Sequence, residues 1–308
     1  MFKLLLLFAG FLGAIAPPPA CSATGGQADV LHVKVKRKLE GSNLMVDFRT
    51  SLIEKALTAS GHKYVIEDCT IPKYPTSDAR YAVLIENGEA CDLLVTASGA
   101  RFTERLLLVP VPIYLGGGGY RVFLANRATV GRMSEIDNLS ALKRARIGSG
   151  TFWSDSDIMA DNGLTVIRAD YQNLFPMLEA GRFDLLSRSI YEVGGEKERI
   201  AGFSHIVVEP RLLLHYPGDL FFYVSRARPD LQHALTVGMT RLYCNGGLRR
   251  HIDQHPSTKD VQAGLHIKDR IVIELANHHL KEDEARAIAN FPPSSAAQKS
   301  SKVCGAAN

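Results

Sequence analysis

Three polar residues, Ser187-Arg188-Ser189, directly follow a short apolar run at residues 183–186. Such a run is typical of a buried strand, and in open α/β sheets ligands bind beyond the carboxyl ends of the strands. A guanidinium between two hydroxyl groups can hold an anionic or polar group by charge-assisted hydrogen bonds. Arg188 and Ser189 are therefore candidate ligand-binding residues.

Two aromatic residues are further candidates for a ligand site. Trp153, the single tryptophan, lies in the loop 149–153, between a strand expected at 146–148 and a helix expected at 154–162. Its ring could stack on a ligand. Tyr114 is a candidate for the wall of a cleft.

Each candidate also has a purely structural explanation. Arg188 could form an ion pair with Glu192 or Asp184, and Trp153 could pack in the core. Asp155 is expected to cap the helix at 154–162 rather than to contact a ligand.

Enzyme motifs are not evident in the sequence. There is no G-x-S-x-G and no H-E-x-x-H. His251 and His255 have a spacing that could share a zinc ion, but Pro256 ends the helix and no third ligand is apparent. The glycines 116–119 precede a strand and lack the Lys-Ser/Thr of a phosphate loop. We therefore expect no enzyme and no cofactor or metal; a hydrolase or lyase on the same scaffold is the alternative.

The order of elements predicts an α/β protein with two lobes. Strands at 30–37 and 64–67 flank an amphipathic helix at 45–60, which implies a parallel pair. The proline-rich segment 109–114 and the four glycines after it predict a crossing to a second lobe. A strongly β sequence at 219–226 is expected to be the return crossing, and residues 267–280 are expected to be helical or mixed.

These observations divide the chain into segments around a ligand cleft. We expect a signal peptide at 1–23, the first part of lobe 1 at 28–118, lobe 2 at 119–224, the return part of lobe 1 at 225–290 and a disordered tail at 291–308. Two lobes joined by two crossings form a clamshell that can close on a ligand.

The composition is ordinary for a soluble globular protein. The 308 residues suffice for two domains, and the contents of 46% hydrophobic and 22% charged residues are ordinary. The formal charge is only +4, and the one basic cluster, at 34–38, alternates as a solvated strand face does. We therefore expect a monomer that does not bind nucleic acid.

The first 23 residues have the pattern of a signal peptide. Lys3 is followed by an apolar run at 4–16, three prolines and small residues up to Ala23. The run is shorter than the roughly 20 residues that span a membrane. Lipid attachment at Cys21 is the alternative, which the prolines before it disfavour. We expect an exported, periplasmic protein.

Export would permit disulfide bonds. Cys69 and Cys91 are the most plausible pair, because they lie in one segment, but two buried thiols would explain them equally well. The spacing of the cysteines does not suit a metal site.

The sequence resembles the bacterial extracellular solute-binding proteins of family 3, which have the type II periplasmic binding fold, over roughly residues 30–280. It is most similar to an uncharacterised branch of transporter substrate-binding-domain proteins. The segments that carry this resemblance are Thr103-Glu104-Arg105, Pro112-Ile113-Tyr114, GSGTFWSD (148–155), NGLTVI (162–167), YQNLFPMLEAGRFD (171–184) with Ser187-Arg188-Ser189, and RIVIELANHHL (270–280).

The resemblance implies specific roles for individual residues. Arg105 would clamp a ligand carboxylate, and Thr151 would add a hydroxyl and main-chain N–H groups at a helix start; a surface salt bridge is the alternative for Arg105. Where the family presents an acid to an α-ammonium group, this chain has Ser189 beside Arg188. Phe102 also replaces an expected hydroxyl. These departures disfavour an α-amino acid and favour an anionic or neutral polar ligand.

The resemblance and the residues together lead to one functional hypothesis. The protein is expected to capture a small polar or anionic molecule between its lobes and to serve a transporter permease or a membrane sensor. An orphan sensing module without a transporter is a further alternative.

Overall fold

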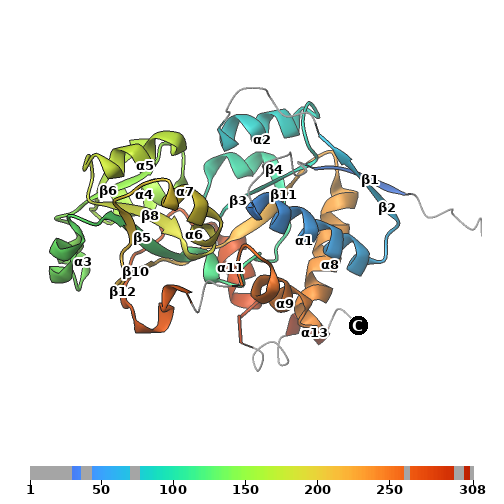
Figure 1. The fold of residues 1–308 in the computed structure, drawn as a ribbon. Coiled ribbons are helices and arrows are strands. Elements are labelled where there is room, and N and C mark those ends of the chain that lie inside the picture. Colours follow the sequence, from blue (N-terminus) through green and yellow to red (C-terminus); the bar gives the residue numbers. More distant parts are fainter. Residues whose placement is uncertain (1–29, 36–43, 70–76, 260–263, 295–301, 306–308) are drawn as a thin grey trace, which may run out of the picture.

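The computed structural model describes residues 30–35, 44–69, 77–259, 264–294 and 302–305. The predicted signal peptide, the alternative lipid site at Cys21 and much of the C-terminal tail therefore lie outside the described residues. Figure 1 shows the predicted mixed α/β architecture of two lobes side by side. None of the described helices is both long enough and apolar enough to span a membrane.

Lobe 1 is built from two small sheets and the helices that cover them. Its elements are β1 (Leu31–Val35), α1 (Leu44–Ser60), β2 (Tyr64–Asp68), α2 (Asp78–Glu86), β3 (Leu93–Ala97), η1 (Arg101–Arg105), β4 (Leu106–Leu108), β11 (Leu220–Ser225), α8 (Pro229–Cys244), α9 (Gly247–Gln254), α11 (Glu282–Asn290) and α13 (Lys302–Gly305). β1 and β2 form the predicted parallel pair, and β11 lies antiparallel between β3 and β4.

Lobe 2 is built around one seven-stranded sheet. Its elements are β5 (Tyr120–Asn126), η3 (Val130–Glu135), α3 (Leu139–Leu142), β6 (Arg146–Gly150), α4 (Ser154–Asp161), β7 (Thr165–Ala169), α5 (Tyr171–Glu179), β8 (Leu185–Ser189), α6 (Ile190–Val193), η4 (Gly194–Glu196), α7 (Lys197–Ala201), β9 (Ile206–Val208), β10 (Leu212–His215) and β12 (Ile271–Glu274). The strand order is β12-β10-β5-β8-β6-β7, and β9 also pairs with β5.

The path of the chain between the lobes differs from the prediction. Residues 109–119 make the first crossing. The return crossing lies at 216–219 rather than at the predicted 219–226, because β11 belongs to the sheet of lobe 1. The chain later enters lobe 2 a second time, because β12 pairs in parallel with β10. The assignment of all of 225–290 to lobe 1 is therefore wrong. Residues 267–280, which were expected to be helical or mixed, contain a 3-10 turn at Ile267–Asp269 and the strand β12. The β-branched run Ile271-Val272-Ile273 forms an edge strand with one inward-facing residue.

The C-terminal region is attached to lobe 1 more firmly than a disordered tail would be. Phe291 is buried against Tyr243 of α8. Cys304 of α13 forms a disulfide with Cys244 at the end of α8. The prediction of a disordered tail from residue 291 is therefore wrong at these positions. Cys69 and Cys91 form a second disulfide, which was one of the two alternatives that the sequence left open.

Two of the four glycines in the first crossing, Gly118 and Gly119, allow the two crossing segments to touch. A Cβ on Gly118 would lie 2.7 Å from the Cα of Asp219, and one on Gly119 would lie 1.9 Å from the carbonyl oxygen of Tyr216. Any larger residue would separate the segments. The glycine run is thus a packing requirement of the hinge.

Candidate functional site

A cavity of about 220 Å³ lies between the lobes. Its charged lining residues are Arg49, Asp78, Arg121, Asp155, Arg188 and Glu192, and its aromatic lining residues are Phe102, Tyr114, Phe152 and Trp153. Both lobes and the first crossing contribute side chains. This is the arrangement expected of a site that closes around a ligand.

The structure brings four of the six candidate residues together in this cavity. Tyr114 of the first crossing lines it together with Trp153, Arg188 and Ser189 of lobe 2. Arg105 and Thr151 do not line it.

Arg105 and Thr151 make other interactions. Arg105 ends η1 with a side chain that is 55% exposed and forms an ion pair with Glu86 of α2 at 2.8 Å. This is the surface salt bridge considered as its alternative. The main-chain N–H of Thr151 donates to the carbonyl of Ala169, so this N–H completes the β6–β7 edge. Neither residue holds the position that the resemblance implied.

Arg188 is a buried ion-pair residue within lobe 2. The polar tripeptide that was expected beyond the strand lies inside β8, and all five residues of β8 are buried. The Nε and Nη2 of Arg188 donate to the two carboxylate oxygens of Glu196, at 2.9 and 2.5 Å, and Glu192 lies 3.3 Å away. Burial by itself would lower the pKa of Arg188, but Glu192 and Glu196 hold it above its ordinary value.

Trp153 packs against this ion pair. Its ring lies 4.7 Å from the guanidinium carbon of Arg188, a cation–π arrangement. Tyr171 donates its hydroxyl to Glu196 at 2.7 Å, and its ring lies 5.4 Å from the same guanidinium. Trp153 is therefore partly packed in lobe 2 and partly exposed to the cavity.

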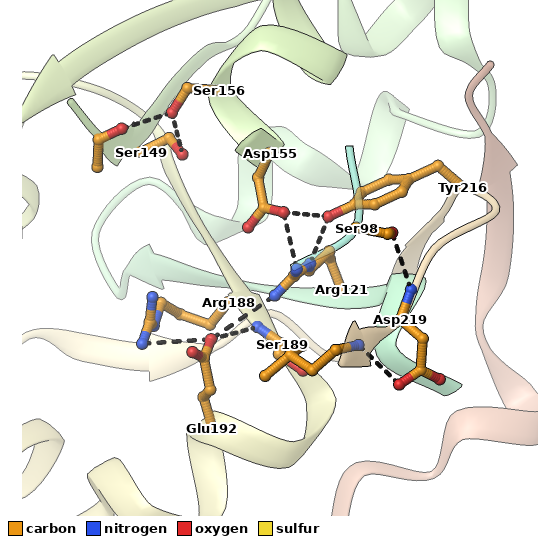
Figure 2. Close-up of polar contacts among 12 residues, drawn as sticks. Ser98, Arg121, Ser149, Asp155, Ser156, Arg188, Ser189, Glu192, Tyr216 and Asp219 are labelled. Atoms are coloured by element: carbon orange, nitrogen blue, oxygen red, sulfur yellow. Dashed lines mark hydrogen bonds and ion pairs between the residues drawn. The ribbon is translucent and has the colours of Figure 1, made fainter. Parts of the chain in front are cut away.

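A second buried ionic group faces the cavity from lobe 2. Figure 2 shows that the carboxylate of Asp155 lies beside both Arg121 and the hydroxyl of Tyr216. Arg121 Nη2 donates to Asp155 at 2.7 Å, and Arg121 Nε donates to the Tyr216 hydroxyl at 2.9 Å. Asp155 makes no capping hydrogen bond, so its expected role as a helix cap is wrong. It lies in the first turn of α4, where a carboxylate favours the positive end of the helix dipole.

Ser189 and Glu192 form the capping box that starts α6. The Ser189 side chain accepts from Tyr191 N–H, and Glu192 accepts from Ser189 N–H at 3.1 Å. Glu192 also lines the cavity. Burial would raise the pKa of Glu192, but Arg188 and Arg121 hold it below the ordinary value. Lobe 2 therefore presents a carboxylate to the cavity three residues after Ser189, and Arg188 does not make this region positive.

Lobe 1 supplies an arginine whose hydrogen-bonding capacity is not used up. The Nε of Arg49, on α1, is buried and has no hydrogen-bond partner among the described residues. The hydroxyl of Tyr114 is also buried and has no hydrogen-bond partner among the described residues. Burial raises the pKa of Tyr114, while Arg49 acts to lower it, so the two groups are close enough to interact. Unsatisfied buried polar groups are uncommon and costly, which makes this pair the feature most suited to a bound polar group.

The carboxylate of Asp219, in the return crossing, holds the two crossings together beside the cavity. Asp219 accepts main-chain N–H groups of Tyr114 at 2.9 Å, Gly116 at 2.6 Å and Leu220 at 2.7 Å. Its own N–H donates to the hydroxyl of Ser98, as Figure 2 shows. Asp219 therefore ties the two crossings to each other.

The two histidines weighed as zinc ligands lie in lobe 1 away from the cavity. His251 is buried between Lys55 Nζ and the carbonyl of Phe48, each 3.1 Å away. His255 lies 3.6 Å from Asp47. Within the described ranges, no three His, Cys, Asp or Glu side chains are grouped so as to hold a metal ion.

The lining residues for which the sequence indicated no role in ligand binding include Arg49, Phe102, Arg121, Phe152 and Glu192. Arg121 and Ser189 are direct neighbours across the antiparallel β5–β8 pair, which no local sequence signal indicates. Glu192 could have been found, because Ser-x-x-Glu before a helix is the signature of a capping box.

Comparisons with proteins of known structure identify the fold of this chain. No family model matches the sequence, and no curated protein matches it. Among solved structures, a periplasmic His/Glu/Gln/Arg/opine family-binding protein from Silicibacter pomeroyi is similar with a TM-score of 0.51 and 10% identity, over 74% of this chain and 97% of that one.

Two further structures are similar with TM-scores of 0.50. One is an amino acid ABC transporter substrate-binding protein from Streptococcus pneumoniae, 15% identical over 74% of this chain and 93% of that one. The other is a histidine kinase sensor domain with similarity to periplasmic binding proteins, 11% identical over 73% and 95%. At such identities the likeness shows the fold alone: the chain has the two-lobe α/β fold of periplasmic binding proteins.

Proposed function

We propose that this protein is a periplasmic solute-binding protein that closes its two lobes on a small polar molecule bearing an anionic group. The observation that carries the proposal is that Arg49 and Tyr114 both line the cleft, and each has a buried polar atom, Arg49 Nε and the Tyr114 hydroxyl, without a hydrogen-bond partner among the described residues. Arg121 and Arg188 also line the cleft, but their charges are matched within lobe 2. Arg49 is thus the guanidinium best placed to receive a ligand oxyanion.

The cavity limits the size of the ligand. Pockets for drug-sized molecules measure about 300–1,000 Å³, whereas this one measures about 220 Å³. A compact metabolite is therefore favoured.

Location and partners are parts of the same proposal. Two disulfides fit an oxidising compartment such as the periplasm. The similar structures include a transporter substrate-binding protein bound to L-arginine and a histidine kinase sensor domain. We propose that a transporter permease or a membrane sensor is the partner that recognises the closed form of this protein.

A ligand screen with two matched arginine variants tests the proposal. Small organic acids, amino acids and sugars are screened by thermal shift, because a ligand that binds the folded state raises the melting temperature. We expect Arg49→Ala to weaken binding of the ligand found by about tenfold or more, since a hydrogen bond to a charged group contributes about 1.5–3 kcal/mol. Arg105→Ala, the control, should leave the affinity unchanged.

The chemical fate of the ligand separates binding from catalysis. NMR spectra of the ligand after long incubation should show no conversion. A protein that no solute stabilises, or one that consumes the ligand, would refute the binding-protein proposal.

A further inference from the structure

Phe152 is the most exposed of the large apolar side chains in the described part of the chain. It is 70% exposed, whereas the other large apolar side chains that are classed as exposed are valines at 38–47%. Phe152 lines the cavity between the lobes, while none of those valines does. An apolar ring held in water at the mouth of a polar cavity gains free energy when a ligand covers it.

Phe152 and its neighbour Trp153 differ in how far they are packed into lobe 2. Trp153 packs into lobe 2: a Cβ on Gly150 would lie 2.3 Å from its ring, so the ring lies directly on the end of β6. That ring also lies against the guanidinium of Arg188 and 6.2 Å from the ring of Tyr171. Both residues line the cavity, but Trp153 is half-buried whereas Phe152 is 70% exposed.

Lobe 1 provides a second ring in the same cavity. Phe102 of η1 is half-buried and packs against the core cluster of α2, β4 and β11. Its remaining surface lines the cavity. Phe102 and Phe152 therefore belong to opposite lobes, and closure of the lobes places both rings against one ligand.

We infer that the ligand is a small organic acid with a flat apolar body, such as an aryl carboxylate, whose body Phe152 and Phe102 cover while its carboxylate binds Arg49. Aromatic rings prefer offset-stacked or edge-to-face contacts, which a planar ligand can make with both side chains. This inference rests on the proposed function and specifies the class of ligand.

The single tryptophan gives a direct measurement. Because Trp153 is the only tryptophan and touches the cavity, its fluorescence reports occupancy. The probes are benzoate and phenylacetate, compared with acetate and L-glutamate. We expect an aryl acid to bind with a Kd at least about tenfold lower than that of acetate or glutamate.

Two variants connect this preference to Phe152. Phe152→Ala should raise the Kd of the aryl acid about tenfold and leave the melting temperature of the free protein unchanged, because the ring is exposed. Val272→Ala removes an exposed apolar side chain of lobe 2 outside the cavity and should change neither.

Three results would overturn the inference: no binding of either aryl acid, equal binding of acetate and the aryl acids, or an unchanged Kd in Phe152→Ala. None of these refutes the proposed function if another solute in the screen binds through Arg49. Failure of every solute to stabilise the protein or change Trp153 fluorescence would refute the proposed function itself.

Discussion

The guanidinium of Arg188 holds both carboxylate oxygens of Glu196 inside lobe 2, and both side chains are only 6% exposed. A buried pair of this kind stabilises the fold only while it is complete, because either partner alone is a buried charge without compensation. Arg188 is thus held by its own lobe before any ligand arrives.

The first prediction concerns this pair. Arg188→Ala should lower the free energy of unfolding by about 3–5 kcal/mol, because Glu196 is left buried and unpaired. The double variant R188M/E196L, which removes both charges, should recover most of that loss. Chemical denaturation of the ligand-free protein measures both. If R188A kept full stability and lost only ligand binding, Arg188 would be a ligand contact instead.

The second prediction concerns the hinge. In Asp219→Asn an amide NH₂ replaces one carboxylate oxygen and faces a main-chain N–H donor, so at least one of the hydrogen bonds from Tyr114, Gly116 or Leu220 is lost. We expect the free energy of unfolding to fall by about 1–3 kcal/mol. Asp157→Asn, which breaks the exposed ion pair with Arg168, is the control and should cost less than about 1 kcal/mol.

A change in ligand affinity would accompany the hinge variant. Because Asp219 ties the two crossings together, the affinity should fall in D219N and remain normal in D157N. Equal stability of the two variants would show that the hinge does not depend on this carboxylate.

The third prediction concerns pH. Lys55 can only donate to His251 Nδ1, and the carbonyl of Phe48 can only accept from Nε2, so the imidazole is neutral. Burial lowers the pKa of His251 to about 4, below its ordinary value of 6.5. The unfolded chain therefore binds the proton more readily, and stability present above pH 6.5 should be lost as the pH falls towards 4.

A substitution isolates this contribution from its neighbours. His255 has a lowered pKa as well, and Lys55 and Asp47 lie close to the pair. His251→Gln keeps a neutral acceptor and donor at this site, so its stability should depend less steeply on pH between 6.5 and 4. Parallel slopes for wild type and H251Q in denaturation at several pH values would contradict the assignment.

The sequence predicted the architecture better than the site. Hydrophobic periodicity and turn residues located most elements, because these signals are local: α1, β2 and the loop that carries Trp153 lie within a few residues of where they were expected. Pairings between distant segments leave no local signal. The short run at 271–273 gave no indication that it would join the sheet of lobe 2.

The site was predicted only in part for a similar reason. Tyr114 and Trp153 follow from their place in a crossing and a loop. The role of Arg105 was implied by a resemblance in the motif Thr103-Glu104-Arg105, and a short motif does not show which surface its last residue faces. In η1 the side chain of Arg105 forms an exposed ion pair with Glu86 and does not line the cavity. Arg49 lies on α1, and the hydrophobic pattern of a helix indicates only which of its faces is buried. The proposed role of Arg49 in ligand binding depends on lobe 2 lying opposite α1, which that pattern does not show.

The strand β12 constrains how this protein can be made. Until residues 271–274 leave the ribosome, the outer edge of β10 has no partner, so lobe 2 cannot complete its sheet while the intervening lobe 1 helices are being synthesised. An unpaired edge strand invites pairing with other chains. A fragment ending at residue 224 would carry that open edge permanently, so the second lobe is not a separable module of the gene product.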